Sequence, residues 1–459
     1  MINALKINNS IILEGRRMIL IGNGMVITQD INNPFISNGA VVLKDNLILE
    51  VGKFNELKNK YKECEFIDAK GKVIMPGLIN THHHIYSAFA RGMDNKEEAA
   101  ENFNEILERL WWKLDKKLTL QDTKYSAYAT YIDCIKNGVT TVFDHHASPM
   151  SITNSLFTIG EVAKELGIRT SLCYEVSDRD GLSIANEGIN ENVNFIKYAN
   201  KDESDMIKGL FGLHASFTLS NDTLEKCAKE MQGLNSGFHV HVAEGISDLH
   251  HSIKHNGKRI VERLFDYKIL GEKSLAVHCV HINNREMDIL KATNTNVVNN
   301  PESNMGNAVG CAPVLEMLNK GINIGMGTDG YTSDMFESMK VFPIIQRHNR
   351  CNPSVAFYET FKLLFENNKN IANRYFNKEV GILKEGAYGD VIILDYNPLT
   401  PMNSSNLYGH MLFGFTGRSV LTTIINGKVV MKNRQLVNID EEKIFADSRE
   451  ISQKLWDKM

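Results

Sequence analysis

The feature that most constrains this chain is a regular alternation of helical patterns with short apolar runs. Leu120–Asn137 precedes Val139–Phe143, and Ile159–Leu166 precedes Arg169–Tyr174. Repeated units of this length indicate a parallel β-sheet, closed or open. The later units, each a predicted helix followed by a predicted strand, are Asp222–Leu234 and Phe238–Val242, Lys258–Tyr267 and Ser274–His278, Arg285–Thr293 and Asn296–Asn299, and Pro313–Lys320 and Ile322–Met326.

The two ends of the chain have a different, β-rich texture. Short apolar runs broken by Gly and Asn turns extend from Ile19 to about Val73, and similar runs return at Gly389–Asp395 and Thr422–Met431. We therefore expect residues 18–75 and 380–437 to form one composite β-domain. Residues 76–379 would hold the alternating region, 438–459 a C-terminal helix, and 1–17 an extension of undetermined role.

Composition favours a small-molecule ligand. The 459 residues carry a formal net charge of -4, and no Lys/Arg block marks a nucleic-acid surface. Seven cysteines without paired C-x-x-C spacing suit a reducing cytoplasm better than a disulfide framework. No run of about 18 apolar residues and no secretion signal is visible, so we expect neither membrane insertion nor export.

Titratable residues follow several of the predicted strands. His82, His83 and His84 come after the apolar run Val73–Asn80, and His278 and Asp329 end two later runs. In a closed parallel barrel, reactive residues lie at the C-terminal ends of strands. His82 and His84 are two residues apart, so in an extended segment both point to one side while His83 points away.

The remaining candidates complete a metal site. Of the two histidines within Phe238–Val242, His241 lies nearer the end of the strand and is favoured over His239. An aspartate at the end of a later strand would add oxygen ligation, giving three histidines, one carboxylate and room for water. Any one of these histidines alone is more often a packed or surface residue, but the joint pattern is much stronger.

Two further groups bear on substrate binding. The paired histidines His145 and His146 follow Val139–Phe143 and could contact a carbonyl-rich heterocycle or a second ion; the alternative is one packed and one solvated residue. Trp111 and Trp112 lie on a predicted helix from Glu101 to Leu118 and could line a lid. Core packing is the alternative for at least one of them.

These residues resemble the amidohydrolase superfamily over nearly the whole chain, in particular its branch of chlorohydrolases and aminohydrolases. Within that branch, Leu110–Asp115, Phe143–Pro149 and Asn300–Gly310 are similar to aminohydrolases associated with selenium metabolism and anaerobic purine use. The resemblance implies an α/β fold, a TIM-like (β/α)8 barrel with a small β-sandwich domain. The motifs that carry it are Pro76–His84, His241–Glu244, His278–Val280, Asn300–Asn304 and Gly327–Gly330.

The resemblance also implies roles for individual residues. His82, His84, His241 and Asp329 would bind one divalent ion, commonly zinc and sometimes iron. Glu244 would shuttle a proton from the water to the leaving nitrogen, and His278 would hydrogen-bond the attacking water. A substrate contact is implied for His214, and we group Asn304 with it and the His145–His146 pair. The bridging lysine of two-metal relatives is missing near His214, so we expect one ion.

The expected activity is hydrolysis of a carbon–nitrogen bond other than a peptide bond by metal-activated water. The substrate would be a small nitrogen-rich heterocycle, such as a purine-derived compound that loses ammonia. Ring opening of a cyclic amide and halide release use the same residues and stay open. A non-catalytic ligand-binding barrel is the alternative of another class, and a homodimer is an open arrangement.

Overall fold

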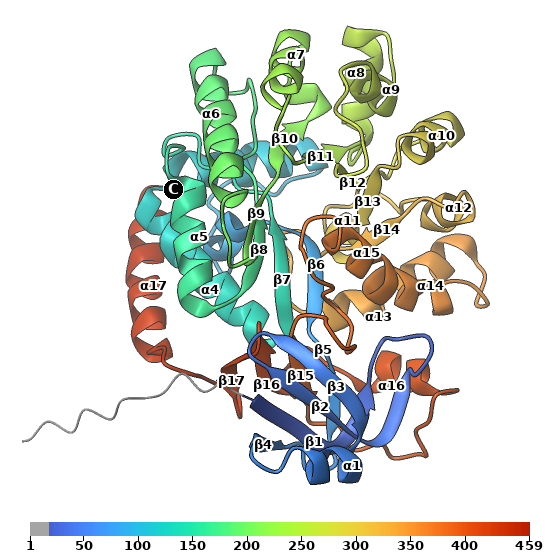
Figure 1. Cartoon of the computed structure of the whole chain (residues 1–459). Coiled ribbons are helices and arrows are strands. Elements are labelled where there is room, and N and C mark those ends of the chain that lie inside the picture. Colours follow the sequence, from blue (N-terminus) through green and yellow to red (C-terminus); the bar gives the residue numbers. More distant parts are fainter. Residues whose placement is uncertain (1–17) are drawn as a thin grey trace, which may run out of the picture.

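The computed structural model describes residues 18–459 of the chain (Figure 1). The predicted extension 1–17 lies outside the described residues. A β-rich unit made from both chain ends lies beside a larger region in which parallel strands are surrounded by helices.

The β-rich unit is a nine-stranded sheet drawn from both ends of the chain. Its order is β18-β17-β16-β15-β5-β1-β2-β3, with β4 paired to β1. β5 is the junction, because it pairs in parallel with β1 and antiparallel with β15. The strands are β1 Met18–Ile27, β2 Phe35–Lys44, β3 Leu47–Lys53, β4 Glu65–Asp68, β5 Val73–Pro76, β15 Val391–Leu394, β16 Val420–Ile425, β17 Lys428–Lys432 and β18 Gln435–Leu436.

Both faces of this sheet are covered, and β1 shows why. Successive side chains of a strand point to opposite faces. Ile19 and Ile21 accordingly join one buried cluster, whereas Leu20 joins another with Phe54 and Leu57. The latter two belong to the short helix α1 (Phe54–Lys60), which packs on that face.

The larger region is built on two parallel sheets. One has the order β6-β7-β8-β9 and the other β10-β11-β12-β13-β14. These strands are β6 Leu78–His83, β7 Val139–Asp144, β8 Arg169–Leu172, β9 Ile207–Gly209, β10 Phe211–Ala215, β11 Phe238–Val242, β12 Leu275–His278, β13 Asn296–Asn299 and β14 Ile324–Met326. Two strands are shorter than expected: β8 ends before Cys173, and β14 begins at Ile324.

Hydrogen bonds join the edges of these two sheets. The carbonyl of His82 accepts from Thr328 N at 3.1 Å and from Asp329 N at 3.0 Å, which ties the end of β6 to the end of β14. On the other side, the segment that follows β8 pairs with β10: Val176 N donates to Gly212 O at 3.2 Å, and His214 N donates to Val176 O at 2.9 Å. The carboxyl ends of strands from both sheets therefore face a common space.

Helices surround these sheets (Figure 1). The predicted helix Glu101–Leu118 is present as consecutive helical pieces, α2 (Phe103–Ile106), a π-helical turn (Leu107–Trp111), α3 (Trp112–Leu114) and a 3-10 turn (Asp115–Lys117). The others are α4 Leu120–Lys136, α5 Ser155–Leu166, α6 Leu182–Ala199, α7 Asn221–Glu230, α8 Ile246–Asn256, α9 Ile260–Asp266, α10 Asn284–Ala292, α11 Pro301–Gly306, α12 Val314–Asn319, α13 Met335–Arg350, α14 Phe357–Phe361, α15 Asn368–Ala372, α16 Leu407–Gly414 and α17 Glu441–Trp456.

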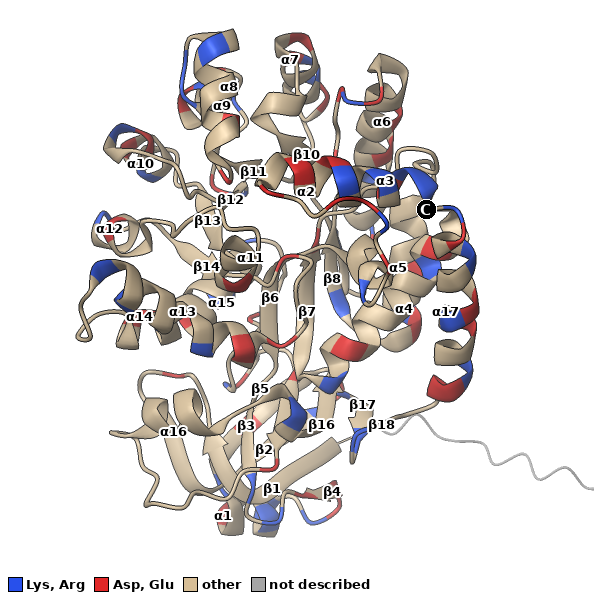
Figure 2. Ribbon diagram, turned by 180° about the vertical axis from the view of Figure 1, so that it is seen from behind, with Lys and Arg blue, Asp and Glu red and all other residues tan. Residues whose placement is uncertain are grey.

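Charged residues lie mainly on the outward helices, whereas the central strands carry few (Figure 2). The last helix, α17, packs along α4, where Tyr125 Oη donates to Asp447 Oδ2 at 3.0 Å. Within residues 18–459, none of the helices is both long enough and apolar enough to cross a bilayer.

Candidate active site

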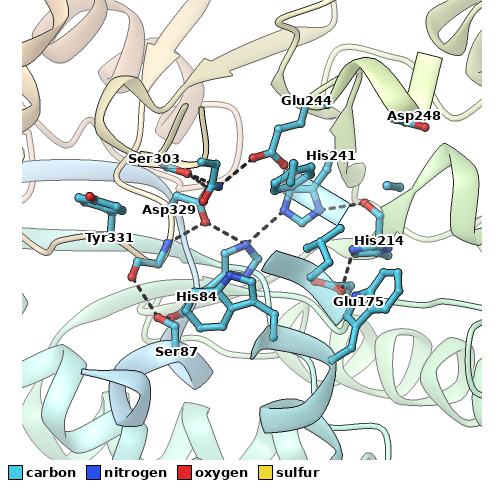
Figure 3. A pocket seen from close by; sticks show the side chains of 18 of the residues that line it. His84, Ser87, Glu175, His214, His241, Glu244, Asp248, Ser303, Asp329 and Tyr331 are labelled. Atoms are coloured by element: carbon cyan, nitrogen blue, oxygen red, sulfur yellow. Dashed lines mark hydrogen bonds and ion pairs between the residues drawn. The ribbon is translucent and has the colours of Figure 1, made fainter. Parts of the chain in front are cut away.

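The four predicted ligands converge where the two parallel sheets meet, and Figure 3 shows three of them, His84, His241 and Asp329. His82 and His84 come from the end of β6, His241 from β11, and Asp329 follows β14. His84 Nε2 lies 3.2 Å from His241 Nε2 and 3.3 Å from Asp329 Oδ1. His82 Nε2 lies 3.9 Å from the same carboxylate oxygen.

The hydrogen bonds of these histidines orient their Nε2 atoms toward one another. His84 Nδ1 donates to the His145 carbonyl at 2.6 Å, and His241 Nδ1 donates to the His214 carbonyl at 2.9 Å. Each neutral ring then keeps a lone pair on Nε2, the arrangement typical of metal-bound histidine.

A divalent ion fits this donor set. His82 Nε2 is buried without a hydrogen-bond partner, and burial, followed by the neighbouring histidines, holds the pKa of His82 and His241 well below the usual value. The ligand atoms of His82, His84 and Asp329 lie within 4.8 Å of one another. An unprotonated nitrogen that water cannot reach needs a positive partner, and zinc prefers nitrogen and carboxylate oxygen ligands.

Backbone geometry at the strand ends aims two of the site residues. His278 has φ 70° and Asp329 has φ 57°, both in the left-handed region that non-glycine residues rarely adopt. Such strain persists where the surrounding structure imposes it and is typical of functional sites. Gly330 N donates to Asp329 Oδ1 at 2.7 Å and Ser303 Oγ donates to Asp329 Oδ2 at 2.7 Å, so both carboxylate oxygens are held.

Glu244 and His278 lie next to this ligand set. His278 Nε2 is 3.3 Å from Glu244 Oε2 and 3.6 Å from Asp329 Oδ2. Burial raises the pKa of Glu244 well above its ordinary value, and the nearby Asp329 carboxylate adds to the rise. Asn304 Nδ2 lies 2.8 Å from His278 Nδ1, so Asn304 contacts the histidine ring.

A pocket opens over these groups, and aromatic side chains form much of its wall. Trp111 and Trp112 both line it, together with Phe103 from α2 and Phe217. Trp111 also packs against a buried cluster, which includes Leu114 and Leu118, so it serves the lining and the packing at once. The segment Phe103–Lys117 thus borders the mouth of the pocket.

The predicted substrate contacts differ in position. His214 lines the pocket, with Nδ1 2.6 Å from Thr218 Oγ1. Neither member of the His145–His146 pair is among the lining residues. His145 Nδ1 lies 3.1 Å from Glu175 Oε2, which does line the pocket, and His146 Nε2 lies 2.9 Å from Ser148 Oγ.

Several lining residues were not among the predicted site residues, notably Glu175, Ser303, Asn307 and Tyr331. Glu175 could have been found, because it is a titratable residue directly after the predicted strand Arg169–Tyr174. Ser303 lies on α11 and Asn307 directly after it, and both fall inside the segment Asn300–Gly310 that carries the resemblance. Nothing in the sequence around Tyr331 indicates a pocket residue.

Comparison with known proteins shows the family. The sequence profile of the Amidohydrolase family matches residues 73–430. A 5'-deoxyadenosine deaminase of Methanosarcina mazei is 30% identical over 447 residues, which covers 95% of this chain and 98% of the relative.

Solved structures show the same fold. An adenosine deaminase from Xanthomonas campestris with bound zinc superposes with a TM-score of 0.85 at 18% identity, covering 95% of this chain and 98% of the other. An atrazine chlorohydrolase from Arthrobacter aurescens TC1 complexed with zinc has a TM-score of 0.79 at 21% identity, covering 95% and 100%.

Proposed function

Because this chain belongs to the amidohydrolase family and is a hydrolase of carbon–nitrogen bonds other than peptide bonds, we propose that it deaminates a purine-derived compound. The observation that carries this proposal is the juxtaposition of a four-residue ligand set with a buried glutamic acid. Glu244 and His278 adjoin Asp329, and Glu244 and Asp329 line the pocket.

We assign one divalent ion, zinc by preference, to His82, His84, His241 and Asp329. When bound there, such an ion lowers the pKa of its water from about 15.7 to about 7, which supplies a nucleophile at neutral pH. The zinc in the two solved structures supports this metal for the present chain.

We also propose that the two parallel sheets together form the TIM-like (β/α)8 barrel, and that the composite sheet forms the satellite β-sandwich.

The other side chains of the site have separate proposed roles. Glu244 takes a proton from the attacking water and delivers it to the leaving nitrogen, for which its raised pKa is suited. His278, steadied by Asn304, offers Nε2 to the same water and to the charge that develops as the carbon becomes tetrahedral. His214 contacts the heterocycle from the opposite wall. For His146, which is fully buried and is not among the lining residues, we propose packing in place of substrate contact.

The screen that tests this function measures ammonia release by the zinc-loaded protein from purines, nucleosides, pterins, triazines and hydantoins. We expect the highest rate with an adenosine derivative. Ring opening would appear as hydantoin loss without ammonia, and halide release as chloride from a chlorotriazine; either result as the dominant activity contradicts the proposal. A link with selenium metabolism, and a homodimer, stay predictions.

Metal content is the first testable prediction. Four ligand-type residues around one centre should bind about one ion per chain, as measured by elemental analysis, and thorough chelation should abolish activity until zinc is returned. Two ions per active chain, or full activity after chelation, would refute the mononuclear assignment.

A further inference from the structure

The lining of the pocket carries acidic residues but no Lys or Arg among the described residues. Its carboxyl groups belong to Glu175, Glu244, Asp248 and Asp329. The guanidinium of Arg179 lies 5.0 Å from the centre of the Trp112 ring and is paired with Asp115 and Asp180. It is thus engaged by two carboxylates outside the pocket, and it also interacts electrostatically with Glu175.

Two of the four carboxyl groups have other roles, and a third has a pKa close to neutral pH. Asp329 belongs to the ligand set and Glu244 moves protons. Burial raises the pKa of Asp248 to about 7, and its Oδ2 accepts a hydrogen bond from Ala243 N at 3.2 Å. Glu175 has no part in the proposed reaction and, unlike Asp248, has a pKa below its ordinary value.

Glu175 is fixed in place and charged. It is only 6% exposed, its Oε2 lies 3.1 Å from His145 Nδ1, and its Oε1 lies 3.5 Å from His214 Nε2. Burial opposes its ionisation, but His214 and His145 outweigh burial and lower the pKa of Glu175 to about 2. It lies beside His214, with His241 between it and Glu244 (Figure 3).

We propose that Glu175 is a specificity-determining residue, which binds an N–H, O–H or cationic group of the substrate and excludes substrates with a phosphate or carboxylate at that position. A carboxylate oxygen has lone pairs for more than one hydrogen bond, so Glu175 can accept from a substrate while keeping its histidine contacts. An anion placed there would meet the buried negative charge of Glu175, and the neighbouring guanidinium of Arg179 is already engaged by Asp115 and Asp180. The inference rests on the proposed function and narrows it to nucleosides and related uncharged heterocycles, as opposed to nucleotides.

The test compares adenosine with adenosine 5'-monophosphate in the parent and in Glu175→Gln, both zinc-loaded with metal content verified. Loss of a charged acceptor should lower kcat/KM for adenosine by about 10- to 100-fold, in line with the 1.5–3 kcal/mol typical of hydrogen bonds to charged groups. The preference for adenosine over the monophosphate should fall at least about tenfold. Glu161→Gln, the same change at an exposed position of α5, should leave both values unchanged.

An unchanged preference in a fully metallated Glu175→Gln variant would overturn the inference. If the parent releases no ammonia from any heterocycle, the proposed function fails, and equilibrium binding of the same two compounds by calorimetry tests the inference separately. A preference for adenosine that Glu175→Gln loses would then support it. Equal binding of the two compounds, or binding of neither, would overturn it.

Discussion

At the scale of single residues, Glu244 is the side chain whose role is easiest to separate from metal binding. Glu244→Gln keeps the size of the side chain but cannot carry a proton between water and leaving group. General acid–base groups contribute about 10²- to 10⁴-fold, and Glu244 acts in two steps, so we expect a loss of kcat near the upper end of that range. Metal content, measured by elemental analysis, should stay that of the parent.

Asp329→Asn is the contrasting variant, because it weakens a proposed ligand and should reduce metal content together with rate. The competing role for Glu244 is a brace held by Asn307, whose Nδ2 lies 3.3 Å from Glu244 Oε1. If Glu244 served only as such a brace, the Glu244→Gln variant would keep most of the activity of the parent. Turnover by Glu244→Gln within about tenfold of the parent, at full metal content, would therefore refute the proton-transfer role; that factor is worth only about 1.4 kcal/mol of barrier.

At the scale of elements, one asparagine of α15 holds the ends of two strands together. Asn368 Nδ2 donates to Ile79 O of β6 at 2.8 Å and to Met326 O of β14 at 2.9 Å. Its Oδ1 accepts from Met326 N at 2.7 Å. Because the side chain is fully buried, no water can replace these bonds, and the pairing of the start of β6 with the end of β14 depends on them.

Asn368→Asp should therefore lower the free energy of unfolding by about 3 kcal/mol or more. The carboxylate cannot donate to the two carbonyls, and each buried polar group left unpaired costs about 1–3 kcal/mol. Asn370→Asp makes the same change two residues away at an exposed position and should shift stability by less than about 0.5 kcal/mol. Urea unfolding followed by circular dichroism measures both; similar values for the two variants would contradict this role of Asn368.

At the scale of the whole molecule, buried neutral histidines make stability depend on pH. Burial lowers the pKa of His83 to about 4, of His146 to about 3 and of His214 to about 4. The unfolded chain protonates these rings near pH 6.5, whereas the folded protein does not. The contribution of these neutral rings to the free energy of unfolding is thus complete above about pH 6.5. It is lost as the pH falls toward their pKa values in the folded protein.

Within that window, each such ring lowers the free energy of unfolding by about 1.4 kcal/mol for each unit by which the pH falls. We expect the three together to remove about 4 kcal/mol of unfolding free energy between about pH 6 and pH 5, measured by urea unfolding of the zinc-loaded protein. His146→Gln should reduce the measured slope by about 1.4 kcal/mol per pH unit, the contribution of one ring; His146 is suited to this test because it lies outside the proposed ligand set. A slope that is flat over this range, or identical in the variant, would contradict the burial argument.

The sequence by itself determined which residues could form the metal site and which segments alternate as strands and helices. Both follow from local rules: strand parity separates His82 and His84 from His83, and apolar periodicity marks β7, β11 and β12. The parallel sheets and the enzymatic class were predicted from these patterns and from the resemblance, and both are confirmed. The long helix α6 was missed, although its apolar periodicity was available in the sequence.

Only the tertiary structure decided which strand ends meet and what surrounds them. Arg169 and Asp390 lie 221 residues apart, yet they form a fully buried ion pair between β8 and the residue before β15, and no local pattern encodes such a contact. The same holds for the different positions of His145 and His146, and for Glu175 between two histidines from other strands. Charge and burial at these positions arise from packing among distant segments, which periodicity in one chain cannot report.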